Sequence, residues 1–514
     1  MSSWDGYVAD IPYVSEYYAN LSPHKLNLAC LIHGINPPSF GMGSAYLELG
    51  CGFGITLLAL AAANPEAQFV GVDYLGEHIQ KAKRLASVAQ LKNIKFLKAE
   101  FGDLAMGKPG LGGPYSYIVA HGVYTWISRR KRIDIQNILK KYLAKNGLLF
   151  LGYNALPGWT NILPAQHLLR ELSKTSGVAG SEGVSDAISR MKAMISAGAK
   201  NLEPMQNMAN LMVPDDDLSL PYIVHEYLHD GWEPMYLQDV ARDMKKVGLN
   251  FVGPVNLLSS LPFLIYTEDQ RSLMDSFEEP LQREQMGDYF RPTFLREDIF
   301  IRGGEKLDQG KSEEMLAKLM FAGTGRESLK IGKNEGTFTA TLDENIYRPM
   351  LEALKEGPRT AQFLMTLSQS KKRQISLSEI VSILLGVRLA VHLPQPGLNC
   401  PRSAFKLTGA LLEDLIAQKL KTTALIITPK RGDAMSVDLF ELAVYMAICK
   451  RLKPGDREFV EQVWSPFFRA GQALVEDGKI IKDEATKSEL LTSKAIKLLQ
   501  QAMPKWKAFG ALPD

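Results

Sequence analysis

The chain has 514 residues, of which 46% are hydrophobic and 22% are charged, and its formal net charge is +3. A chain of this length is expected to hold about three domains, and its composition excludes an intrinsically disordered protein. The small net charge argues against nucleic acid, or an anionic membrane, as the main partner. The N-terminus lacks the basic and apolar regions of a signal peptide, and the longest apolar stretch, residues 55–64, is about half the length that spans a bilayer. We therefore expect a cytoplasmic protein with no membrane insertion.

The first 160 residues predict an α/β domain. Residues 1–40 are predicted to be a helical lead-in, with an apolar helix at 26–33 that Pro37 and Pro38 end. From residue 41 to 159, strands alternate with helices, which is typical of a parallel sheet covered on both faces, as in Rossmann-like folds. The predicted strands are 45–49, 68–72, 94–98, 115–120 and 147–153, and the predicted helices are 55–63, 76–89 and 131–143.

The alternation stops after residue 159 and resumes near Tyr236. Residues 160–230 are predicted to be a helical insertion with a loop at 177–184. Because it would lie beyond the carboxyl ends of the strands, where open α/β sheets bind ligands, we expect it to be a substrate lid. Residues 231–265 are predicted to return to the core sheet, with a helix at 236–247 and a strand at 249–253. A connecting middle or regulatory region is expected at 266–343, and a winged-helix-like module with a helix at 377–385 is expected at 344–433. The C-terminal region at 434–514 is predicted to be mostly α-helical.

A glycine-rich turn, Glu48-Leu49-Gly50-Cys51-Gly52-Phe53-Gly54, stands at the first strand-to-helix junction. Glycines at such a junction let the backbone approach a ligand closely. A dinucleotide-binding turn reads G-x-G-x-x-G, and here Ile55 stands where its third glycine would fall. Glu48 would repel a pyrophosphate but would attract the ammonium and sulfonium of S-adenosylmethionine (AdoMet). The turn therefore favours AdoMet over a dinucleotide, and over a Rossmann-like fold with a vacant site.

Acidic residues also follow the next two predicted strands. Asp73, followed by Tyr74, ends the second strand, where a carboxylate can accept hydrogen bonds from both ribose hydroxyls, although dinucleotide enzymes share this acid. After the third strand, a carboxylate of Glu100-Phe101-Gly102-Asp103 can accept from the adenine amino group, and Phe101 can cover the adenine ring or offer its backbone N–H. The predicted AdoMet-binding residues are Tyr17, Glu48, Gly50, Cys51, Gly52, Gly54, Asp73, Tyr74, Glu100, Phe101, Asp103 and His121.

Four further groups of segments resemble one bacterial family, the class I AdoMet-dependent methyltransferases with a methyltransferase regulatory domain. They are residues 12–18 with 21–23, 121–126, 153–159, and 225–228 with 232–236 and 239–240. The family is similar to bacterial lysine methyltransferases of outer-membrane proteins, so the resemblance implies a protein substrate, with a cell-envelope protein as candidate and lysine as the acceptor. It also implies a homodimer, and a plan of catalytic domain, middle region and C-terminal domain.

Methyl transfer is an in-line displacement, so a nucleophile must be held in line while water is kept out. A lysine must also lose its proton, because its usual pKa is about 10.4. His121, after the fourth strand, is a candidate general base, or it holds the cofactor through its backbone. Tyr124 and Trp126 line a lysine channel or pack the start of a helix. Tyr153 and Asn154 follow the fifth strand, and the Asn154 amide positions the amine or caps a turn.

Other segments leave alternatives open. Tyr17, with Tyr13 and Tyr18, caps the cofactor pocket or packs the first helix. Residues 225–229 match H-E-x-x-H in form, but no third ligand is evident, so we predict no metal. Lysines and an arginine at 371–373 are predicted to lie in a solvated loop. The competing functions are a methyltransferase for a small molecule or glycan, and a non-catalytic AdoMet-binding regulator that contacts DNA, against which the near-neutral charge speaks.

Overall fold

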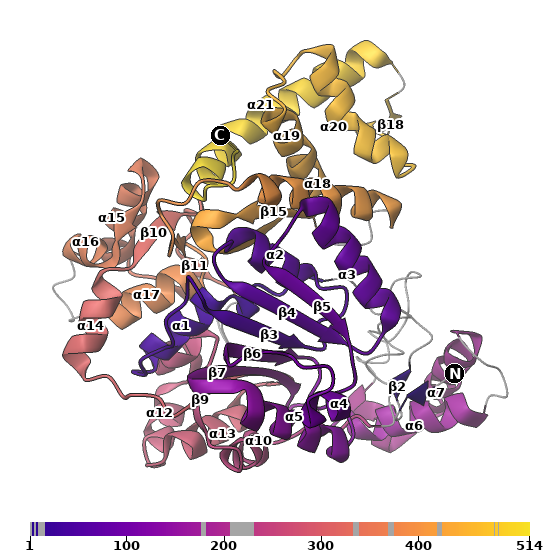
Figure 1. The fold of residues 1–514 in the computed structure, drawn as a ribbon, viewed down its shortest axis with the longest axis vertical. Helices are drawn as coiled ribbons and strands as arrows, with labels where there is room; N and C mark the ends of the chain where they lie inside the picture. The colour runs from indigo at the N-terminus through magenta and orange to yellow at the C-terminus, as the bar shows by residue number, and fades with distance from the viewer. Residues whose placement is uncertain are drawn as a thin grey trace.

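Figure 1 shows the computed structural model, in which a central sheet carries helices on both faces and the C-terminal helices stand beside α2 and α3. None of its helices within the ranges given next is long and apolar enough to cross a membrane. The structure describes residues 3–4, 7–8, 16–175, 181–205, 231–332, 339–368, 375–418, 424–476, 479–481 and 483–513.

The central sheet has the strand order β5-β4-β3-β6-β7-β9-β8. Strands β3 to β7 pair in parallel, whereas β9 runs antiparallel to both β7 and β8. This order confirms the predicted Rossmann-like α/β fold. The strands are β3 (Ala45–Leu49), β4 (Gln68–Asp73), β5 (Ile94–Lys98), β6 (Tyr115–His121), β7 (Leu143–Asn154), β8 (Leu249–Pro254) and β9 (Leu295–Arg302).

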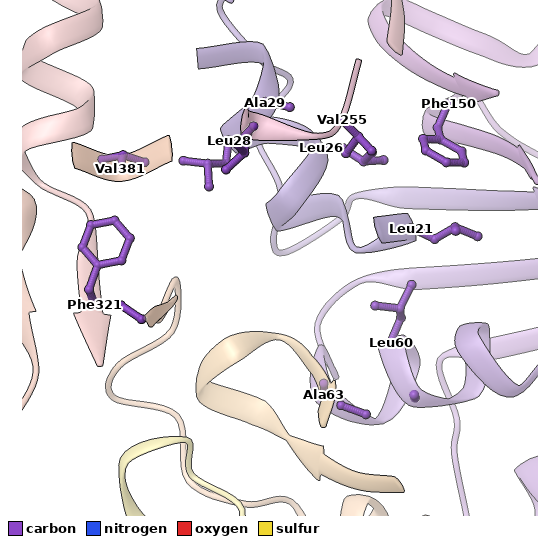
Figure 2. Packing of buried hydrophobic residues seen from close by; sticks show 14 of the residues in the cluster. Leu21, Leu26, Leu28, Ala29, Leu60, Ala63, Phe150, Val255, Phe321 and Val381 are labelled. Atoms are coloured by element: carbon purple, nitrogen blue, oxygen red, sulfur yellow. The ribbon is translucent and has the colours of Figure 1, made fainter. Parts of the chain in front are cut away.

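Side chains of each strand alternate between two hydrophobic cores, one on each face of the sheet. Tyr46 packs with α1, α2 and α3, whereas Leu47 packs with α4, α5 and α10. Figure 2 shows part of the first core, where Phe150 of β7 and Leu60 of α2 pack beside Leu21 and Leu26. The covering helices are α1 (Pro23–Ile32), α2 (Ile55–Ala63), α3 (Gly76–Ala89), α4 (Phe101–Met106), α5 (Arg129–Tyr142) and α10 (Leu237–Lys245).

Three of these elements differ from the sequence prediction. Strand β9 lies inside residues 266–343, which were expected to be connecting structure, and it is hydrogen-bonded on both edges. Helix α4 was not predicted, because its six residues are too few for a helical period to show. Helix α1 begins at Pro23, three residues before the predicted start, and ends at Ile32, one residue before the predicted end.

The insertion after β7 begins with helices α6 (Leu163–Thr175) and α7 (Ser181–Ser196) and the short helix η2 (Lys200–Met205). Helix α7 starts inside the stretch at 177–184 that was predicted to be a loop. A separate hydrophobic cluster joins the insertion to the loops after β6 and β7, and its largest members are Trp126, Trp159 and Trp232. Residues 206–230 lie outside the described part of the chain, so the insertion as a substrate lid stays a prediction.

The C-terminal half packs against the face that carries α1 to α3. Strands β10 (Met320–Gly323), β13 (Arg359–Thr360) and β14 (Ala390–His392) form a small antiparallel sheet beside three helices, and the winged-helix-like description of this part stays a prediction. The hairpin of β15 (Ala424–Thr428) and β16 (Asp433–Val437), with helix α18 (Arg402–Ala417), contacts α2 and α3 directly (Figure 1).

The other elements connect these parts or complete the C-terminal half. Those before residue 300 are β1 (Ser3–Trp4), β2 (Tyr7–Val8), η1 (Ala19–Leu21), η3 (Leu257–Ser260), α11 (Pro262–Ile265), α12 (Glu268–Met274) and α13 (Pro280–Phe290). The later ones are α14 (Gln309–Ala317), β11 (Lys330–Ile331), β12 (Ala340–Thr341), α15 (Glu344–Glu356), α16 (Ala361–Thr366), α17 (Leu377–Gly386), η4 (Pro429–Arg431), α19 (Leu439–Cys449), α20 (Arg457–Arg469), β17 (Val475–Glu476), β18 (Lys479–Ile480) and α21 (Glu484–Ala508).

Arg296 of β9 supplies a test of how much this strand stabilises the fold. Its buried guanidinium contacts Asp298 Oδ2 at 2.8 Å and Asp288 Oδ1 at 2.8 Å. Arg296→Met would leave the buried Asp298 without its cation and Asp288 with only the more distant Arg291, at 3.7 Å, which costs about 3–5 kcal/mol of unfolding free energy. Urea unfolding should show this loss. Arg457→Met, which breaks an exposed ion pair with Glu461, is the control and should leave the unfolding midpoint unchanged.

Candidate functional site

The glycine turn between β3 and α2 adopts a backbone that other residues rarely reach. Gly50, Gly52 and Gly54 have φ of 75°, 53° and 69°, in the left-handed region that favours glycine. A Cβ on Gly50 would lie 2.5 Å from Cγ2 of Val123, whereas a Cβ on Gly52 would meet no atom within 4 Å. The turn is therefore packed against the loop after β6 at Gly50 and is open at Gly52, where a ligand can come close.

Asp73, at the end of β4, is held by the backbone of this turn. Its Oδ2 accepts from the Gly52 N–H at 2.9 Å, and its Oδ1 accepts from the Leu75 N–H at 2.9 Å. Each oxygen of an ionised carboxylate can accept a second hydrogen bond. Asp73 can therefore receive two ribose hydroxyls while it fixes the position of the glycine turn.

Glu48 lies beside Asp73, and one of its carboxyl oxygens has no hydrogen-bond partner among the described residues. Its side chain is buried, and Oε2 has no hydrogen-bond partner in the described part of the protein. Burial, and after it the negative charge of Asp73, raises the pKa of Glu48 to about 8. A cation placed against Oε2 would offset both effects. The orphaned carboxylate thus fits the ammonium group of AdoMet, and the thiol of the buried Cys51 stays protonated because burial, Asp73 and Glu48 raise its pKa.

The residues expected around the adenine differ in burial and in their existing contacts. Glu100 Oε2 accepts a hydrogen bond from Lys131 Nζ at 2.9 Å, so part of its charge is already used. Phe101 is buried at the start of α4, and Asp103 is exposed on that helix. Tyr74 is half-buried next to Asp73. The adenine roles of Glu100, Phe101 and Asp103 stay predictions.

His121, the last residue of β6, lies against an aromatic ring. Its imidazole centroid is 4.4 Å from that of Tyr18, and its Nδ1 has no hydrogen-bond partner among the described residues. Burial lowers the pKa of His121 to about 4, so the imidazole is neutral near pH 7. Tyr18 also joins this edge to α2, because its N–H donates to Thr56 Oγ1 at 2.9 Å.

Two predicted catalytic tyrosines, Tyr124 and Tyr153, have hydroxyl groups that bond to residues of the core face, and their catalytic role stays a prediction. The Tyr124 hydroxyl donates to Asp243 at 3.2 Å and accepts from Gln136 at 3.1 Å. The Tyr153 hydroxyl donates to Asp298 Oδ2 at 2.6 Å, within the buried network of Arg296. Both side chains belong to the core face of α4, α5 and α10. Alternation along β7 places Tyr153 there, whereas Tyr124 lies in the loop after β6.

Three other predicted residues have structural contacts. Trp126 packs on Trp232, with ring centroids 5.9 Å apart. Asn154 exchanges two contacts with Thr125, whose hydroxyl donates to Oδ1 at 3.3 Å and accepts from the Asn154 N–H at 3.1 Å. The Tyr17 hydroxyl accepts from the Ala434 N–H of β16 at 2.9 Å, so this phenol binds the C-terminal hairpin. The sequence left open whether Tyr17 caps the cofactor pocket or packs the first helix, and its cofactor role stays a prediction.

Two polar residues of this edge were not found by sequence reasoning. Glu297 of β9 accepts a hydrogen bond at Oε2 from Asn20 Nδ2 at 2.8 Å, and its Oε1 lies 3.9 Å from Nδ1 of His121. Asn20 lies between residues 12–18 and 21–23 but was not singled out there, and no local motif surrounds Glu297, whose strand β9 was not predicted. Asn20 follows Tyr18 by two residues, and this spacing within segment 16–21 is the sequence feature that could have indicated it.

Metal-binding residues do not gather within the part of the chain that the structure describes, where no group of three or more histidine, cysteine or carboxylate side chains could hold an ion. The H-E-x-x-H match at 225–229 and Tyr13 lie outside the described residues, and so does the basic stretch at 371–373.

Comparison with known proteins supports the interpretation of both parts of the sheet. Residues 41–206 match a family described as "Methyltransferase domain", and residues 219–302 match one described as "Predicted methyltransferase regulatory domain". The second match ends at Arg302, the last residue of β9. An uncharacterized protein of Synechocystis is 28% identical over 497 residues, which is 96% of each chain.

Two further comparisons concern the fold and the cofactor. The structure of PKMT2 from Rickettsia typhi in complex with AdoHcy has a TM-score of 0.67 and 19% identity, and the similarity covers 98% of this chain and 100% of that one. The tRNA (guanine-N(7)-)-methyltransferase of Rubrobacter xylanophilus is 49% identical over 58 residues, 11% of this chain and 26% of that protein. The methyltransferase-domain match of residues 41–206, together with the buried Glu48 and the geometry of Asp73, identifies the cofactor as S-adenosylmethionine.

Asp73 should be needed for cofactor affinity. Asp73→Ala removes the acceptor for the ribose hydroxyls and for the Gly52 N–H, so AdoMet binding should weaken by about 1–3 kcal/mol, or roughly 5- to 150-fold. Titration calorimetry measures this directly. Glu77→Ala, an exposed acid on the next helix, is the matched control, and an unchanged affinity in Asp73→Ala would contradict the placement of the ribose.

Glu48 should make cofactor binding depend on pH. The cationic ligand binds the ionised carboxylate, whereas the free protein holds the proton below a pKa of about 8. Affinity should therefore rise as the pH rises from 5.5 to 7.5, with proton release on binding and a slope of up to tenfold per pH unit. Calorimetry in buffers of different ionisation enthalpy measures both. Glu48→Gln should bind more weakly and lose the slope, and a slope that persists in this variant would assign the proton to another group.

Proposed function

Because this chain is an AdoMet-dependent methyltransferase that carries a methyltransferase regulatory domain, we propose that it methylates lysine side chains of a protein. The observation that carries the proposal is the similarity to PKMT2 of Rickettsia typhi, a protein lysine methyltransferase, over the whole of both chains. That similarity extends through the insertion and the C-terminal half, which a minimal methyltransferase domain does not need. The resemblance of segments 121–126 and 153–159 adds independent support.

The residues of the strand edge fit the requirements of methyl transfer to an amine. AdoMet supplies a methyl group activated by the sulfonium. Asp73 and the glycine turn orient the nucleoside, and Glu48 holds the cationic amino-acid end, so the reacting methyl is presented at a fixed place. His121 and Tyr18 line the sheet edge with a neutral imidazole and an aromatic ring. Such a partly desolvated surface lowers the pKa of an approaching lysine and favours its reactive, uncharged form.

The acceptor is a protein of the cell envelope in this proposal, as it is for the family that the chain resembles. A small-molecule or glycan acceptor and a regulatory role remain the alternatives. A small-molecule or glycan methyltransferase would place the methyl group on that acceptor, whereas a non-catalytic regulator would transfer none.

Incubation with labelled AdoMet and a detergent-solubilised bacterial outer-membrane protein fraction should place label on lysine side chains. Mass spectrometry of the labelled peptides identifies the residue. Asp73→Ala should reduce the labelling in line with its loss of cofactor affinity, which shows that the label comes from this site. Label found only on lipid, sugar or small molecules would contradict the proposal.

A further inference from the structure

A row of three residues crosses the sheet edge next to the cofactor residues. In the strand register, His121 of β6 pairs with Gly152 of β7, and Gly152 pairs with Glu297 of β9. Gly152 has no side chain, and a Cβ there would lie 2.0 Å from Nδ1 of His121. The imidazole therefore occupies the space above β7, and its Nδ1 comes within 3.9 Å of Glu297 Oε1.

Glu297 has unused hydrogen-bonding capacity at this place. Among the described residues, its side chain accepts one hydrogen bond, from Asn20 at Oε2, although an ionised carboxylate can accept about four. Its side chain is 22% exposed, so a proton can pass between it and solvent. Burial raises the pKa of Glu297, whereas the Asn20 hydrogen bond and the charge of Lys25 lower it and Asp298 raises it.

The contrast with the neighbouring acid on the same strand argues against a purely structural role. Asp298 points to the other face and binds Arg296 directly. Within the described residues, no lysine or arginine nitrogen approaches Glu297 within the 4 Å of an ion pair, and Lys25 acts on it only at longer range. A carboxylate half enclosed without a bound cation is a place where an ammonium group can bind.

Glu297 also lies on the same face of the sheet as Glu48, the carboxylate expected to bind the cofactor. Glu48 pairs with Val119, and His121 lies two residues further along β6 on the same face. Segment 18–20 connects α2, which follows the glycine turn, with Glu297, because the Tyr18 N–H donates to Thr56 of α2 and the Asn20 amide donates to Glu297. An acceptor that reaches the cofactor along this face passes Tyr18, His121 and Glu297.

We propose that Glu297 is the residue that binds the acceptor's primary ammonium group and removes its proton, with His121 and Tyr18 beside it as the walls of this subsite. An N–H bond of the ammonium breaks, an O–H bond forms at Glu297 Oε1, and the electron pair left on the neutral nitrogen becomes available for methyl transfer. The proton then leaves from Glu297 to solvent. This assignment rests on the proposed function, since only an amine acceptor carries such a proton.

Glu297→Gln tests the assignment, because the amide keeps the shape and the acceptor for Asn20 but cannot take a proton. With AdoMet saturating, kcat at pH 7 should fall about 10²-fold or more. The ratio of wild-type kcat to variant kcat should fall by up to tenfold per pH unit as the pH rises toward 9.5, because the amine then loses its proton to solvent unaided. AdoHcy affinity and the melting temperature should stay as in the wild type. Glu305→Gln, an exposed acid bonded to Asn36 at 3.0 Å, is the matched control and should change none of these quantities.

A second measurement needs no protein acceptor. In the AdoHcy complex, n-butylammonium, which imitates the end of a lysine side chain, should shift the His121 imidazole resonances in NMR spectra of the wild type. The same titration of Glu297→Gln should show at least tenfold weaker binding, and Glu297→Asp should recover part of the affinity.

The outcomes separate this assignment from the proposed function. A kcat within threefold of the wild type, a loss that is equal at pH 7 and pH 9.5, or a parallel loss of AdoHcy affinity would each overturn the role of Glu297. Label on a residue other than lysine in the wild type would overturn the proposed function instead. In that case the butylammonium titration still decides whether Glu297 binds an ammonium group.

Discussion

Strand β9 is hydrogen-bonded on both edges, to β7 and to β8, and it runs antiparallel to both. The two faces of this one strand do different work. On one face, Arg296 and Asp298 form the buried ion pairs that connect to Tyr153 of β7. On the other face, Glu297 stands at the open edge beside His121. The regulatory-domain match ends with this strand, so the sheet of the methyltransferase domain is completed by residues of the region named for regulation.

Carboxylates buried at the strand ends have three different environments. Asp73 accepts two backbone hydrogen bonds, and Asp298 binds a guanidinium, so each charge is compensated within the protein. Glu48 has an oxygen with no partner in the described structure, and its pKa is raised to about 8. Burial of an uncompensated carboxylate costs free energy. That cost is removed when a cation binds, which makes the same residue unfavourable for the free protein and favourable for the complex.

The segment from residue 16 to 25 joins the site to the C-terminal half. Tyr17 binds the Ala434 N–H of β16, whereas Tyr18 and Asn20 reach the cofactor helix and Glu297. Lys25 carries an electrostatic interaction to both Asp433 and Glu297. Helix α18 packs on α2 and α3, the helices that follow the glycine turn and Asp73. The C-terminal half is thus in contact with the elements that position the cofactor residues, both through α18 and through segment 16–25.

The sequence by itself determined the parts of the protein that depend on neighbours in the chain. The strand-and-helix alternation predicted the Rossmann-like sheet, and Glu48, the glycine turn and Asp73 were identified because a ligand at the end of one strand needs a short, local set of residues. Roles that depend on which strands pair could not be deduced in this way. Tyr124, Tyr153 and Tyr17 stand beside the motifs in sequence, yet alternation and distant partners turn their hydroxyls to Asp243, Asp298 and Ala434. The place of Glu297 was decided by the tertiary structure alone, because it lies on an antiparallel strand far along the chain and comes close to His121 only when the sheet forms. Gly152 lies between them, and its role is to leave space for the imidazole.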